Sequence, residues 1–162
     1  MRSIGGGVVV LALVILTGCA MHSDQPADPD VSIAAAKKIT QAAEVKAMHL
    51  VPRSDVEQVE QLKTGTLLSC SSGWLWSGGI KATLRPGVEG ADVQKALAEA
   101  AKEHGFTVTR DNLLTGDARY ELVDANKVQL LVTVYDDGTL LNVNSASPCI
   151  SLPDDFRPPA DF

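Results

Sequence analysis

The strongest constraint on the fold is a pair of alternating segments that flank the dipeptide Asp137-Gly138. Residues 128–135 carry an apolar side chain at every second position, and residues 140–145 form a returning segment after the dipeptide. Such alternation is typical of a half-buried strand. Asp-Gly between two strands favours a tight hairpin turn. The C-terminal half of the chain is therefore predicted to contain an antiparallel sheet.

Further strands and one strong helix are predicted before this hairpin. The strands fall at residues 66–70, 80–85, 106–110 and 118–124. Between the second and the third, residues 91–104 have the spacing of an amphipathic helix. The apolar stripe of this helix consists of Val93, Leu97, Ala100, Ala101 and His104. Gly105 follows directly and is typical of a helix C-terminus.

The region before the first strand is predicted to be helical. Small and apolar residues recur near helical spacing between residues 33 and 47, with polar positions that include Glu44. Pro52 ends this helix. Ser54-Asp55-Val56-Glu57 then has the form of a capping box, which predicts a second short helix to about Leu62.

The order of these elements predicts an α+β fold. The simplest packing is a mainly antiparallel sheet of five to six strands with one covering helix, preceded by N-terminal helices that cover the other face or lie along an edge. Residues 31–162 are expected to form a single domain, helical over 31–63 and with the sheet and its helix over 64–150. Residues 151–162 form a proline-rich tail that is expected to be extended and ordered at most in part.

The first residues have the layout of a secretory signal peptide. Arg2 precedes an apolar run of 13 residues from Ile4 to Leu16, and Leu16-Thr17-Gly18-Cys19 resembles the lipobox of bacterial lipoproteins. Cleavage of residues 1–18 would leave Cys19 to carry lipid, with residues 19–30 as a polar tether. The alternatives are a retained transmembrane helix, which needs about 20 apolar residues, and cleavage to a soluble secreted form.

The three cysteines predict one disulfide bond. With Cys19 lipidated, Cys70 and Cys149 remain as an even pair in an oxidising compartment. The alternative is two free thiols. A metal site is not expected, because the sequence contains no Cys-x-x-Cys or His-x-His spacing.

The charge of the chain argues against nucleic acid as a partner. The formal net charge is −6, and it becomes −7 when Arg2 is removed with the signal peptide. An acidic chain lacks the basic surface that neutralises phosphates. It also lacks a basic cluster for anionic headgroups, so membrane contact is expected through the lipid on Cys19.

Trp74 and Trp76 are the candidate ligand-binding residues. They lie two positions apart, so an extended segment would place both indoles on the same face. One interpretation is an aromatic surface for a glycan, lipid or peptide. The other is that both rings pack against the disulfide and close the core.

No catalytic residue and no cofactor is predicted. The sequence contains no Gly-x-Ser-x-Gly elbow, P-loop or dinucleotide fingerprint. The remaining polar candidates occupy positions that suit a tether, a helix end, a turn or a loop. These candidates are His22, His49, His104, Asp136, Asp137, Asp154, Asp155, Ser69, Ser71 and Ser72.

The combined pattern resembles a family of small actinobacterial lipoproteins. The lipobox, the N-terminal helix, Leu67-Leu68-Ser69-Cys70, Trp76-Ser77-Gly78, the following helix and the strands that end near Cys149 are similar to the mycobacterial LppA-like lipoproteins. The resemblance implies an anchored envelope domain with one disulfide and assigns no catalytic residue.

The functional expectation follows from the anchor and the disulfide. The chain is expected to be a non-enzymatic binding or accessory module on the extracytoplasmic face of the cell membrane, with an envelope protein, glycan or lipid as its partner. The alternatives are a carrier of a lipid or other apolar ligand and, less favoured, a hydrolase of envelope polymer, which would need two carboxylates across a cleft.

Overall fold

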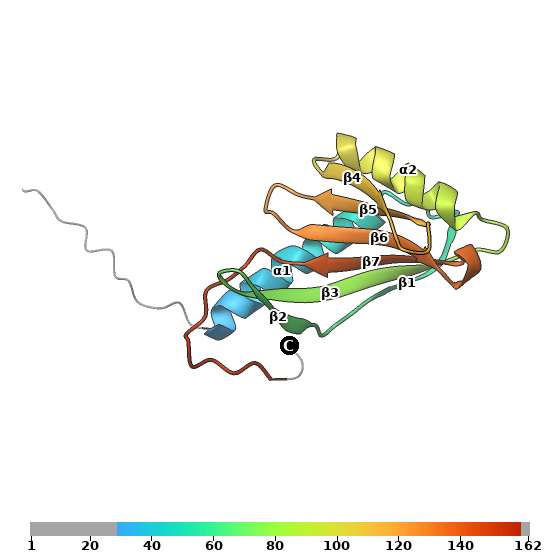
Figure 1. Cartoon of the computed structure of the whole chain (residues 1–162). Coiled ribbons are helices and arrows are strands. Elements are labelled where there is room, and N and C mark those ends of the chain that lie inside the picture. Colours follow the sequence, from blue (N-terminus) through green and yellow to red (C-terminus); the bar gives the residue numbers. More distant parts are fainter. Residues whose placement is uncertain (1–28, 160–162) are drawn as a thin grey trace, which may run out of the picture.

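The alternating segments around Asp137-Gly138 form the predicted antiparallel hairpin. Strands β6 (Gln129–Tyr135) and β7 (Leu140–Ala146) pair along their length and are joined by the 3-10 turn η1 (Asp136–Gly138). The computed structural model describes residues 29–159 (Figure 1). The other elements, in chain order, are α1 (Pro29–Met48), β1 (Val56–Gln61), β2 (Thr66–Cys70), β3 (Gly73–Leu84), α2 (Gly90–Glu103), β4 (Thr107–Asn112) and β5 (Ala118–Val123).

The strands form one antiparallel sheet, which confirms the predicted α+β class. The order across the sheet is β1-β3-β7-β6-β5-β4, and β2 also pairs with β3. Strand β3 is long enough for β1 to pair with its second half and β2 with its first half, so β1 and β2 together make one edge of the sheet. The sheet has seven strands, where five to six were expected, because β1 had been predicted as a helix.

Residues 54–62 are the clearest local error of the sequence prediction. The side chain of Ser54 donates to the carboxylate of Asp55 instead of capping a helix. The spacing of three between Val56 and Val59 looks helical, but an irregularity between Val56 and Gln58 absorbs the extra residue. Val56 and Val59 therefore pair with Leu84 and Ala82, two buried residues on the same face of β3.

Both helices pack on the same face of the sheet. One continuous hydrophobic core joins Ala43 and Ala47 of α1, Val93 and Leu97 of α2, and the facing side chains of the strands. The strand residues in this core include Ile80, Ala82, Leu84, Tyr120, Leu122, Leu130, Val132, Leu141 and Val143. Helix α1 crosses behind the sheet in Figure 1 and contacts mainly β3, whereas α2 contacts β4 to β7.

The placement of α1 differs from the two predicted alternatives, which were the other face and an edge. The register of the strands puts Lys81, Asn142 and Thr133 side by side on the other face. Leu131 and Leu140 share this face with them, but the polar residues interrupt its apolar surface, whereas the facing side chains of the other face belong to one continuous hydrophobic core. Helix α1 therefore lies beside α2 on the apolar face.

A second, smaller core lies at the end of the molecule where α1 begins. Ile33 and Ala36 of α1 pack with Leu67 and Trp76. Side chains of the C-terminal segment complete this core, namely Ile150, Leu152 and Phe156, together with Trp74. The proline-rich tail is therefore packed against the domain over these residues instead of being merely extended.

Candidate functional site

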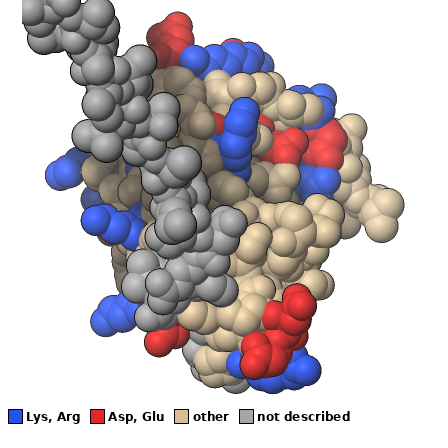
Figure 2. Space-filling view, turned by 90° about the vertical axis from the view of Figure 1, so that its left-hand side faces the viewer, with Lys and Arg blue, Asp and Glu red and all other residues tan. Residues whose placement is uncertain are grey.

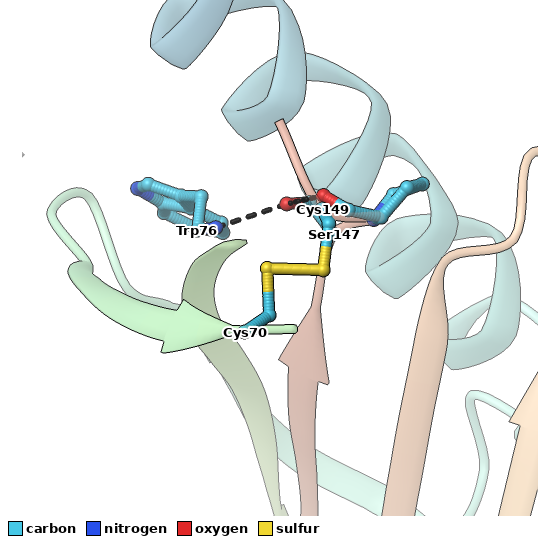
Figure 3. The surroundings of a disulfide bond; sticks show 5 residues. Cys70, Trp76, Ser147 and Cys149 are labelled. Atoms are coloured by element: carbon cyan, nitrogen blue, oxygen red, sulfur yellow. Dashed lines mark hydrogen bonds between the residues drawn. A yellow bond between two sulfur atoms is a disulfide. The ribbon is translucent and has the colours of Figure 1, made fainter. Parts of the chain in front are cut away.

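The disulfide joins the start of the sheet to the segment after its last strand. Cys70, at the end of β2, is bonded to Cys149, with a Cα–Cα distance of 6.2 Å and a sequence separation of 79 residues (Figure 3). The chain beside this bond is held by hydrogen bonds as well. The backbone N–H of Trp76 donates to Ser147 Oγ at 2.9 Å, and Trp74 exchanges backbone hydrogen bonds with Ile150. The pairing predicted from the sequence is present in the structure.

Trp74 and Trp76 lie on the same face of β3, and the structure separates their roles. Trp76 is fully buried in the small core, so it presents no surface to a ligand. Its ring packs over Gly78, where a Cβ atom would lie 2.2 Å from Trp76 Cη2. Trp74 is partly buried and meets Phe156 edge to face, with ring centroids 6.5 Å apart. Of the two candidate residues, only Trp74 retains exposed surface.

Glu44 is a buried carboxyl group that the sequence did not single out. It lies on the inner face of α1 and is fully excluded from solvent. Ser145 Oγ of β7 donates to one carboxylate oxygen, and Gln61 Nε2 of β1 donates to the other at 2.7 Å. Burial raises the pKa of Glu44, and the hydrogen bonds from Ser145 and Gln61 oppose this rise. Glu44 therefore connects α1 to two strands and is not exposed to a substrate.

A groove between α1 and the edge strand β1 is the most apolar hollow among those described at the surface. It has a volume of about 490 Å³. Its walls come from the second half of α1, the connection to β1, β1 itself and Ile80 of β3. The apolar lining consists of Val45, Met48, Val51, Val56, Val59 and Ile80, and the polar rim of His49, Arg53, Glu57, Gln58 and Gln61. Val59 remains 47% exposed within it.

The sequence prediction missed this groove because it missed β1. A helix over residues 54–62 would have turned Val56 and Val59 along one stripe toward the core. As a strand, β1 continues the sheet beyond the part that α1 covers, which leaves its apolar side chains open. The available signal was the residue type at Val56 and Val59, because valine favours strands, although their spacing of three is helical in form.

The remaining polar candidates occupy the positions that the sequence suggested. His49 is exposed at the rim of the groove. His104 is exposed after the last turn of α2, so its predicted place on the apolar stripe of that helix is wrong. Asp136 and Asp137 form the hairpin turn with φ angles of 53° and 52°. His22 and Cys19 lie outside the described residues. Among residues 29–159, no group of three or more His, Cys, Asp or Glu side chains could hold a metal ion.

The charged side chains do not gather into one basic surface on the end that Figure 2 presents. Lys and Arg lie interspersed with Asp and Glu, and a broad area beside the grey residues carries neither. Within residues 29–159, no helix is both long enough and apolar enough to span a membrane.

Comparisons with protein families, with curated proteins and with solved structures found no match for this chain.

Proposed function

We propose that the mature chain is a lipid-anchored binding module on the extracytoplasmic face of the cell membrane, without catalytic activity of its own. The observation that carries this proposal is the bond between Cys70 and Cys149. Because these two cysteines are paired, Cys19 is left as the cysteine that the lipobox marks for lipid. A disulfide is also typical of proteins that fold outside the cytoplasm.

The position of α1 is compatible with such an anchor. The helix begins at Pro29, and the tether from Cys19 would reach the molecule at the end that holds the disulfide and the tail. In this arrangement, that end lies nearest the membrane. The lipid on Cys19 then holds the protein at the membrane, since two acyl chains suffice for stable anchoring.

The groove beside β1 supports the binding role. Its volume falls within the range of about 300–1,000 Å³ that is usual for ligand sites. The buried carboxyl of Glu44, by contrast, is fully used in contacts between α1 and the sheet. The resemblance to the LppA-like lipoproteins implies only an anchored envelope domain with one disulfide, so the binding role that we propose depends on the groove.

Metabolic labelling with an alkynyl palmitate analogue tests the anchor. The wild-type chain should be labelled and should sediment with membranes, whereas Cys19→Ala should lose the label and leave the membrane fraction. Cys70→Ser/Cys149→Ser is the matched control, because it removes two cysteines and should keep the label. A Cys19→Ala chain that stays labelled would contradict the proposal.

A carrier of an apolar ligand is the second candidate, favoured by the apolar lining of the groove. The layer between the helices and the sheet is filled by side chains such as Leu97, Leu122 and Leu130, so the groove is where we place the ligand. A fluorescent fatty acid added to the released Cys19→Ala chain should bind, and Val59→Lys should weaken binding. Absence of binding, together with no co-purified lipid in native mass spectrometry, would exclude this role.

A further inference from the structure

The exposed edge of β1 is the part of the molecule that the fold leaves incomplete. Strand β1 lies at the end of the sheet order, as Figure 1 shows at the lower edge, and β3 is its one neighbour among the described strands. The backbone N–H of Leu62 donates to Gly79 at 2.9 Å, so Leu62 faces β3. Because backbone groups alternate along a strand, those of Gln58 and Glu60 also face β3, and those of Val59 and Gln61 face outward.

The side chains of β1 alternate between two environments. Val59 lies opposite Ala82 on the face that carries the helices, at the floor of the groove. Gln58 and Glu60 lie opposite Thr83 and Lys81 on the other face of the sheet. Glu60 forms an ion pair with Lys81 at 3.2 Å, with both side chains partly exposed.

We infer that the edge of β1 pairs with the same edge of a second copy of this chain. In an antiparallel pair centred on Val59, Val59 lies opposite Val59 of the other copy, and their outward backbone groups can exchange hydrogen bonds. Gln58 then lies opposite Glu60 of the other copy, and Glu60 opposite Gln58. The carboxylate of Glu60 in each copy therefore faces the exposed carboxamide of Gln58 in the other copy, which can donate to it.

The neighbouring registers lack this complementarity. Centring the pair on Glu60 places two carboxylates directly opposite each other, which is unfavourable. Centring it on Gln58 also lets outward backbone groups pair, but it places Glu60 opposite Val56 of the other copy, which offers no donor to the carboxylate. The register centred on Val59 satisfies the backbone and the charges together, as an interface between identical copies requires.

The pairing would also complete the groove. A two-fold axis perpendicular to the sheet keeps both helix layers on one side, so the grooves of the two copies meet across the axis. Val59 from each copy lies at the centre of the combined apolar floor, between the two α1 helices. The seven-stranded sheets then become one continuous sheet, and the exposed edge that favours non-specific pairing is covered.

Cross-linking of the full-length chain in its own membranes tests the inference. Val59→Cys should give a disulfide-linked dimer on mild oxidation, because opposite residues in such a pair lie about 5.5 Å apart between Cα atoms. Leu114→Cys is the control, since this fully exposed loop residue lies away from β1 and should give little dimer. Mass spectrometry should find the peptide linked through position 59, with the bond between Cys70 and Cys149 intact.

A charge exchange on the same background tests the register. Gln58→Glu places two carboxylate pairs across the axis and should reduce the dimer about three- to tenfold. Adding Glu60→Gln restores each carboxylate to a carboxamide partner and should recover the dimer. Both positions are exposed, so the variants should fold normally, as circular dichroism would verify.

The outcomes separate this inference from other occupants of the edge and from the anchor. A Val59→Cys chain that stays monomeric, that links to a different protein, or that dimerises regardless of the charge exchange would overturn it. The same cross-link is expected in the released Cys19→Ala chain, because the pairing does not depend on lipid. If Cys19 is not lipidated, the cross-linking test of the dimer can still be carried out. If the chain does not dimerise, the proposal of a lipid anchor is unaffected.

Discussion

At the scale of single residues, Glu44 shows where sequence reasoning reached its limit. Its spacing of four from Thr40 places it on the buried stripe of α1, but its charge favoured the solvent side. Its two partners, Gln61 and Ser145, are 17 and 101 residues away in the chain. A pattern of residues along one helix contains no information about such partners, so the buried network could not be predicted.

The raised pKa of Glu44 predicts a pH dependence of stability. The neutral form is favoured in the folded chain, so this group contributes stability that is fully present below the ordinary value of 4.5. That contribution is lost as the pH rises through the higher pKa of the folded state. The Glu44→Gln variant should lack this loss of stability with rising pH. Urea denaturation between pH 4 and 8 should show the difference, with the exposed Glu103→Gln retaining the wild-type slope.

Trp76 and Trp74 should differ strongly in their contribution to folding. Trp76→Ala removes a fully buried indole and should lower the free energy of unfolding by about 3–5 kcal/mol. Trp74→Ala should cost less, because its ring is partly exposed. Equal losses in denaturant titrations of the two variants would contradict the assignment of Trp76 to the core.

At the scale of elements, long periodic segments were predictable and the edge strand was not. The helix over residues 91–104 and the strands from residue 66 onward have clear periodicity, and the structure confirms them within one or two residues, apart from β3. That strand starts earlier than expected, at Gly73, because pairing with β2 draws the glycine-rich segment into the sheet. Strand β1 pairs with β3 alone among the described strands, and the irregularity between Val56 and Gln58 interrupts the alternation of its side chains.

The C-terminal tail is an element whose order arises from tertiary contacts. Phe156 packs edge to face on Trp74, and three prolines elsewhere in the tail gave no periodic signal. Phe156→Ala should lower the free energy of unfolding by about 1–2 kcal/mol and change the fluorescence of Trp74. The exposed Arg157→Ala is the control. Unchanged stability of Phe156→Ala would show that the tail is not part of the folded unit.

At the scale of the whole molecule, the disulfide contributes to stability through the loop that it closes. The pair Cys70 and Cys149 was predictable from the cysteine count together with the predicted lipidation of Cys19. The groove beside β1 could not be predicted in the same way, since its walls come from α1, β1 and β3 together. Its shape depends on how far α1 extends across the sheet.

Removing the disulfide should destabilise the chain without changing its architecture. The bond joins cysteines with a sequence separation of 79, which corresponds to about 4.5 kcal/mol in the chain-entropy model. Cys70→Ser/Cys149→Ser should therefore unfold at a lower denaturant concentration, with the circular dichroism spectrum retained. Adding a reductant should lower the stability of the wild-type chain to that of the double variant and leave the variant unchanged. A variant as stable as the wild type would contradict this role.

The small core at the start of α1 also bears on how the molecule responds to mechanical force. A protein held through its N-terminus receives any pull at Pro29, in the first turn of α1. That turn rests through Ile33 on Trp76, and the covalent bond at Cys149 clamps the adjoining tail to the sheet. Tension that enters through the N-terminus would thus be met first at the cross-linked end of the domain.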